Sequence, residues 1–73
     1  MKKLPVAKHL TNQEYQLLLK VYADHNRSMG LEKRAKYTLS NIVKVERNQE
    51  EKCLNVYYGN GDWWHYVSNG TWY

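Results

Sequence analysis

The chain has a single cysteine, so no disulfide can form within it. Small secreted domains usually need such cross-links, and we therefore expect a protein of the reducing cytoplasm. No stretch approaches the roughly 20 apolar residues of a membrane-spanning helix. Near the N-terminus, Lys8 and His9 interrupt the apolar stretch before it reaches the length of a signal-peptide core. We expect no membrane association and, because no catalytic signature is present, no enzyme.

The composition is that of one small folded domain. The chain has 73 residues, of which 42% are hydrophobic and 25% are charged, which is too apolar for a disordered protein. A chain of this length buries only about 60% of its unfolded surface, so it has room for one thin core. The net charge of +4 favours anionic partners such as nucleic acid. We expect a single α+β domain over residues 1–73, with 1–10 as a flexible N-terminal segment.

A capping box predicts the start of an amphipathic helix. The Thr11 hydroxyl can accept a hydrogen bond from the Glu14 amide, and the Glu14 carboxylate can accept one from the Thr11 amide. We expect the helix to run from about Asn12 to about His25, before a polar stretch that ends the pattern. Apolar residues recur at helical spacing and should pack on a sheet. This predicted helix face consists of Tyr15, Leu18, Leu19 and Tyr22, and Leu17, Val21 and Ala23 widen it.

The rest of the chain predicts an antiparallel β-meander, and the helix should pack across this three- to four-stranded sheet. A polar loop at 48–52 and two Asn-Gly turns separate the strands. The basic stretch 31–36 between helix and sheet is interpreted as a loop or one extra helical turn. Strands are expected within four ranges, which are 37–47, 53–58, 62–67 and 71–73.

The turn at residues 59–61 determines which side chains face the core. A two-residue turn would place Val56 opposite His65. A three-residue loop, with Gly61 in the left-handed region, would place Val56 opposite Trp64. We prefer the second register because it keeps His65 out of the core. The core face then carries Leu54, Val56, Tyr58, Trp64 and Tyr66, and the opposite face carries Asn55, Tyr57, Trp63 and His65.

The predicted meander contains the pattern Ser40-x-Ile42-x-x-Val45, then Leu54-x-Val56-x-Tyr58, then Gly61-x-x-Trp64-x-Tyr66. Over residues 40–66 this pattern resembles the KTSC domain, a small module at the C-terminus of some lysyl-tRNA synthetases and in free-standing bacterial and phage proteins. That family usually continues with a proline and a helix. This chain instead continues with a second Asn-Gly turn and has its helix before the sheet. The resemblance implies a nucleic-acid-binding role.

The chain has more aromatic side chains than a small core needs, and we expect the surplus to form a binding face. Its predicted members are Tyr57, Trp63, His65, Trp72 and Tyr73. Flat rings on an open sheet can stack unpaired bases, and basic side chains can neutralise phosphates. The predicted basic residues are Lys33, Arg34, Lys36, Lys44 and Arg47.

These residues favour a non-enzymatic binding module for single-stranded nucleic acid or RNA. The alternative is a protein–protein interaction module, such as a phage or mobile-element protein that inhibits or retunes a host protein. A further interpretation is that the aromatic face lies under the N-terminal segment or under a second copy of the chain. A homodimer would then form through the sheet face or its free edge.

Neither a metal site nor another cofactor is expected. The soft metal ligands are Cys53 and the three histidines His9, His25 and His65, and no pair of them has the close spacing that is typical of a zinc site. We expect the histidines to be solvated or packed at an edge of the core. The Asp24-His25 pair lacks a nucleophile, so it does not indicate catalysis.

Overall fold

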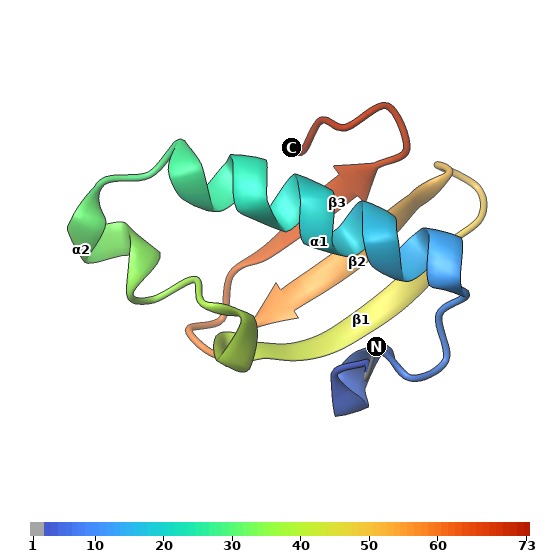
Figure 1. Cartoon of the computed structure of the whole chain (residues 1–73), viewed down its shortest axis with the longest axis horizontal. Coiled ribbons are helices and arrows are strands. Elements are labelled where there is room, and N and C mark those ends of the chain that lie inside the picture. Colours follow the sequence, from blue (N-terminus) through green and yellow to red (C-terminus); the bar gives the residue numbers. More distant parts are fainter. Residues whose placement is uncertain (1–2) are drawn as a thin grey trace.

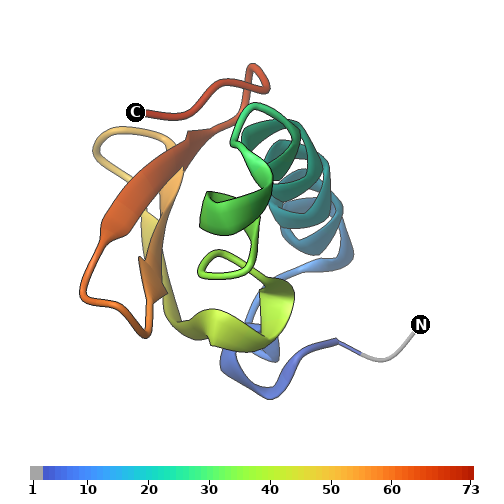
Figure 2. The ribbon, with the colours of Figure 1, turned by 90° about the vertical axis from the view of Figure 1, so that its left-hand side faces the viewer.

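A helical layer packs on one face of an antiparallel sheet in the computed structural model, which describes residues 3–73. Figure 1 shows the long helix lying across the sheet, and Figure 2 shows it on one side of the strands. The predicted α+β fold is therefore confirmed. In chain order the elements are η1 (Pro5–Ala7), α1 (Asn12–Arg27), α2 (Leu31–Arg34), η2 (Leu39–Asn41), β1 (Ile42–Asn48), β2 (Cys53–Tyr58) and β3 (Trp63–Val67).

The predicted capping box starts α1. The Thr11 amide donates to Glu14 Oε1 at 2.8 Å, and the Glu14 amide donates to Thr11 Oγ1 at 3.1 Å. The helix ends at Arg27 rather than near His25. It extends further because the hydroxyl of Ser28, just after the helix, donates to the His25 carbonyl at 2.6 Å. The predicted extra helical turn is also present, as α2.

The buried face of α1 is rotated relative to the prediction. Leu19 and Tyr22 are only partly buried, whereas Val21 and His25 lie in the interior. A histidine can take this place because the Tyr66 hydroxyl lies 2.9 Å from its Nδ1 atom and satisfies it. The buried residues of α1 are therefore Tyr15, Leu18, Val21 and His25.

The three strands pair in the order β1-β2-β3, with the register that the three-residue loop predicts. Val56 pairs with Trp64, and Leu54 pairs with Tyr66. Gly61 has a φ of 93°, in the region that favours glycine. The preference for the three-residue register is therefore confirmed, and His65 faces away from the core.

The first and last predicted strands are shorter than expected. β1 begins at Ile42 because residues 39–41 form η2, whose last carbonyl, that of Asn41, accepts the Gly59 amide at 2.7 Å. The expected strand 71–73 is reduced to a single bridge between Tyr66 and Trp72. Two backbone hydrogen bonds between His65 and Tyr73, of 2.9 and 3.1 Å, hold this chain end beside β3.

The prediction of a flexible N-terminal segment is wrong for residues 3–10. Ala7 and Leu10 are buried in the core, and the Lys3 ammonium donates to the Leu10 carbonyl at 2.7 Å. The segment is held because its apolar side chains cover the end of the core beside β1. In Figure 2 it lies on the same side of the sheet as α1. Within residues 3–73 there is no helix with the length and apolar character needed to cross a membrane.

Candidate functional site: the outer face of the sheet

The sheet face turned away from α1, here called the outer face, is the candidate site. Figure 2 shows that no helix among residues 3–73 covers it, and that the C-terminal residues run toward it. Side chains alternate between the two faces of a strand, so the outward neighbours of the buried residues line this face. Across the strands, Lys44 pairs with Tyr57 and Tyr57 pairs with Trp63, while Glu46, Asn55 and His65 form the next row.

Four of the predicted binding residues form a continuous set of ring contacts on the outer face. Tyr57 stacks on Trp63 with 5.5 Å between the ring centroids, and Trp63 contacts His65 at 4.8 Å. His65 stacks on Tyr73 at 4.3 Å. Trp63 is 48% exposed and Tyr73 is 58% exposed. We call Tyr57, Trp63, His65 and Tyr73 the aromatic row.

The prediction that Trp72 belongs to this face is wrong. Its ring stacks on His25 at 5.1 Å and packs against the core on the helix side. The reason is the bridge between Trp72 and Tyr66, because directly paired residues point to the same face and Tyr66 points inward. Tyr73 is the next residue and therefore points outward.

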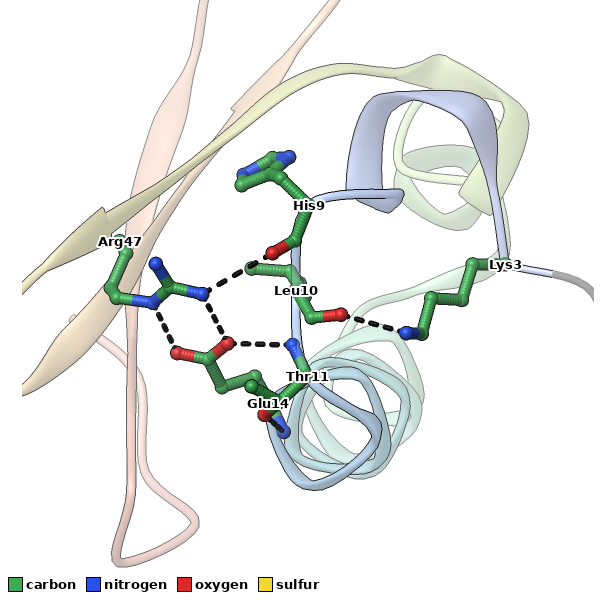
Figure 3. A network of polar contacts seen from close by, with 6 residues as sticks. All are labelled: Lys3, His9, Leu10, Thr11, Glu14 and Arg47. Carbon is green, nitrogen blue, oxygen red and sulfur yellow. Dashed lines mark hydrogen bonds and ion pairs between the residues drawn. The ribbon is translucent and has the colours of Figure 1, made fainter.

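Arg47 has a structural role on the helix side of the sheet, as Figure 3 shows. Its guanidinium forms two hydrogen bonds with the Glu14 carboxylate and donates to the His9 carbonyl at 3.3 Å. Hydrogen bonds from Arg47 lower the pKa of Glu14 to about 2, and the hydrogen bond from the Thr11 amide is the second largest cause. Arg47 pairs with the inward-facing Leu54, so it cannot serve the outer face.

Arg34 also serves the fold. Its Nε atom donates to the carbonyls of Asn26 and Met29, both at 3.1 Å, and a terminal nitrogen donates to the Arg27 carbonyl at 3.0 Å. These are carbonyls at and just beyond the C-terminal end of α1, which lack partners within the helix. The predicted phosphate-binding role of Arg34 therefore conflicts with its contacts.

Of the five predicted basic residues, Lys44 alone lies on the outer face. Its Nζ atom is 5.6 Å from the centroid of the Tyr57 ring and 3.2 Å from Glu46 Oε1. Lys33 and Lys36 are exposed, but they belong to α2 and the turn after it, on the α1 side of the sheet in Figure 2. The predicted basic set is thus divided between two faces.

A second cluster of rings lies on the inner face around His25. His25 is 3% exposed, its Nδ1 atom contacts the Tyr66 hydroxyl at 2.9 Å, and that hydroxyl is 2.6 Å from the Tyr58 hydroxyl. Burial lowers the pKa of His25 and raises the pKa of Tyr58 to about 12. The expectation of a solvated or edge-packed His25 is wrong. His25 lies at helical spacing from Leu18 and Val21, and this spacing was the sequence signal that could have predicted its burial.

The structure also assembles metal-ligand atoms that the sequence spacing did not connect. Glu51, Cys53 and His65 each offer one such atom, and all three atoms lie within 4.8 Å of one another. The strand pairing explains this, because Cys53 pairs with Val67 and so lies diagonally opposite His65. The expectation of no metal site rested on sequence spacing alone, and sequence spacing does not reveal this proximity in space.

No protein-family model, curated protein or solved structure matches this chain. The resemblance of residues 40–66 to the KTSC domain accordingly stays a prediction from the sequence pattern.

Proposed function

We propose that the protein is a non-enzymatic binding module that contacts a partner protein through the aromatic row. The observation that carries this proposal is the exposure of Trp63 and Tyr73, about half of each side chain, on a sheet face that no helix of the described residues covers. Tryptophan and tyrosine are enriched among the residues that dominate protein interfaces. They bring large contact area and a polar group at the rim of the ring.

The ring geometry favours a protein partner over stacked bases. The Tyr57 and Trp63 rings lie at 20° to each other, and the His65 and Tyr73 rings at 9°. Each ring therefore turns one face toward its neighbour, which leaves fewer free ring faces on which a base could stack. A protein surface can pack against the exposed edges without separating these pairs.

The charges around the aromatic row support the same choice. Lys44 is neutralised by Glu46 at 3.2 Å, and Glu51 Oε2 lies 3.2 Å from His65 Nε2. Nucleic-acid binding depends on several lysine or arginine contacts to phosphates. A face of mixed charge with aromatic side chains is instead typical of protein interfaces.

Nucleic-acid binding is the second candidate. It is favoured by the net charge of +4, by the exposed Lys33 and Lys36, and by the position of Lys44 beside the Tyr57 ring. The resemblance to the KTSC domain implies the same role. Single-stranded RNA or DNA would then need to contact two faces of the molecule, since the lysines are divided between them.

The test is capture of partners from lysate by the intact protein and by the double variant Trp63→Ala/Tyr57→Ala, with and without nuclease. Leu31→Ala is the matched control, because Leu31 is 82% exposed and lies in α2, outside the outer face. We expect a nuclease-resistant protein that the wild type and the control bind equally. The double variant should lose about 2 kcal/mol or more of its binding free energy.

Two outcomes would change the assignment. Capture that requires nucleic acid, together with an affinity that falls steeply with salt, would support the second candidate. Equal binding by the double variant and the wild type would exclude the aromatic row as the interface. Sedimentation of the purified protein, with the same variants, tests whether the partner is a second copy of this chain.

A further inference from the structure

We propose that Glu51, Cys53 and His65 form a binding site for a Zn²⁺ ion, which shares His65 with the aromatic row. Their potential ligand atoms all lie within 4.8 Å of one another, and Glu51 Oε2 and His65 Nε2 are 3.2 Å apart. The site joins the loop before β2, the first residue of β2 and the middle of β3. It therefore depends on the strand register and not on a local sequence motif.

The distances suit a tetrahedral site. Zinc bonds of about 2.0 to 2.3 Å place neighbouring ligand atoms roughly 3.3 to 3.8 Å apart. The carboxylate and imidazole already have this spacing, at 3.2 Å. The Cys53 sulfur lies within 4.8 Å of both atoms, so small side-chain rotations can bring the three ligand atoms to this spacing.

The donor set selects the class of ion. A thiolate and an imidazole suit Zn²⁺ and are poor ligands for Mg²⁺ and Ca²⁺, which prefer a shell of oxygen atoms. Cys53 is the chain's only cysteine, is free of a disulfide and is buried, and its sulfur lies within 4.8 Å of the other two ligand atoms. Three protein ligands leave the fourth tetrahedral position for water or for a group of a bound partner.

Tyr73 positions two of the three ligands. Its carbonyl oxygen lies 3.4 Å from His65 Nδ1, which favours the tautomer that leaves the Nε2 lone pair for the ion. Its ring stacks on the imidazole at an interplanar angle of 9°, and its hydroxyl donates to Glu51 Oε2 at 3.1 Å. Such outer contacts are usual around zinc ligands, and they orient the ligands before the ion binds.

The proposal is tested by titrating the reduced, intact protein with Co²⁺, a spectroscopic substitute for Zn²⁺. We expect a thiolate-to-cobalt charge-transfer band that saturates at one ion per chain and disappears when Zn²⁺ is added. Cys53→Ser should abolish the band. His65→Gln and Glu51→Gln should each weaken Co²⁺ binding at least tenfold, and Tyr73→Phe should weaken it by about tenfold, as outer-contact losses do.

Two matched variants control for non-specific effects. Glu50→Gln removes a carboxylate next to Glu51 in the sequence, and His9→Gln removes an exposed imidazole of the N-terminal segment. Both should bind Co²⁺ as the wild type does. Circular dichroism without metal checks the fold of every variant. If Cys53→Ser does not fold, the His65, Glu51 and Tyr73 variants decide the question by their affinities.

The absence of a charge-transfer band in the folded wild type at saturating Co²⁺ would overturn the proposal. A band of unchanged affinity in His65→Gln and Glu51→Gln would also overturn it, because the thiol alone would then account for the signal. Neither result depends on the partner-binding assay, so the zinc site and the proposed function can fail separately.

Discussion

The two faces of the sheet each carry a histidine among aromatic rings, and the two clusters differ in their exposure to solvent and in their hydrogen bonds. On the inner face, His25 is 3% exposed and shares hydrogen bonds with Tyr66, which in turn contacts Tyr58. On the outer face, His65 stacks on Tyr73, which is 58% exposed. The His25 imidazole and the Tyr66 and Tyr58 hydroxyls satisfy one another on the inner face, although the buried Trp64 Nε1 atom finds no hydrogen-bond partner within residues 3–73. The outer rings instead keep surface for other molecules. The sheet face on which a histidine lies, and not the residue type, decides its role in this protein.

The energetic consequence is that the inner face stabilises the domain. Full burial of a large apolar side chain contributes about 1.5 to 3 kcal/mol, and a half-exposed ring contributes less. Removal of an inner side chain should therefore cost folding free energy, and removal of an outer one should mainly cost binding.

Leu18→Ala should lower the free energy of unfolding by about 2 to 5 kcal/mol, because Leu18 is fully buried against the sheet and its loss leaves a cavity. Urea denaturation followed by circular dichroism measures this change. Leu31→Ala, at a position that is 82% exposed, should stay within about 0.5 kcal/mol of the wild type. Equal costs for the two leucines would break the assignment of the inner face.

Gly61→Val should cost about 1 to 2 kcal/mol, because Gly61 has a φ of 93° that side-chain-bearing residues resist. No atom lies within 4 Å of the position of an added Cβ, so the cost arises from the backbone alone. Thermal unfolding measures it. Gly59→Ala is the control, since Gly59 has no positive φ and its Cβ would meet its neighbours at 3.6 Å. A harmless Gly61→Val would mean that this loop does not set the register.

The stability should fall as the pH decreases below about 6.5, the ordinary pKa of histidine, because burial lowers the pKa of His25. In that range the unfolded chain takes up a proton that the folded chain resists, so protonation favours unfolding. The contribution of His25 is at most about 1.4 kcal/mol per pH unit. Urea denaturation at several pH values between 5 and 7 should show this slope in the wild type and in His9→Gln. An unchanged slope in His25→Gln would contradict the burial of a neutral imidazole.

Trp63→Ala should produce the smallest change in stability, a loss of about 0.5 to 1.5 kcal/mol from the lost stacking on Tyr57. Its unfolding should stay cooperative, and the chemical shifts of the buried Tyr66 should be retained. Nuclear magnetic resonance and thermal unfolding together measure both properties. A loss as large as that of Leu18→Ala would show that the aromatic row supports the fold, which would remove the basis for a free binding face.

Much of the fold was predictable because its signals are local. The capping box of Thr11 and Glu14 determines where α1 begins, since both hydrogen bonds join residues three apart in the sequence. The glycine at position 61 and the alternation of side chains determine the β2-β3 register and therefore which rings face outward. These features need no knowledge of distant parts of the chain.

The sequence by itself thus determined the α+β order, the start of α1, the register of the last hairpin, and the outward position of Tyr57, Trp63 and His65. Only the tertiary structure decided which long polar side chains were free and which rings were covered. Arg47 is held by Glu14, and Trp72 turns inward while Tyr73 turns outward. The approach of Cys53 to Glu51 and His65 likewise follows from strand pairing. The physical reason is that such contacts join segments far apart in the sequence, whose relative position is set by packing and not by local preference.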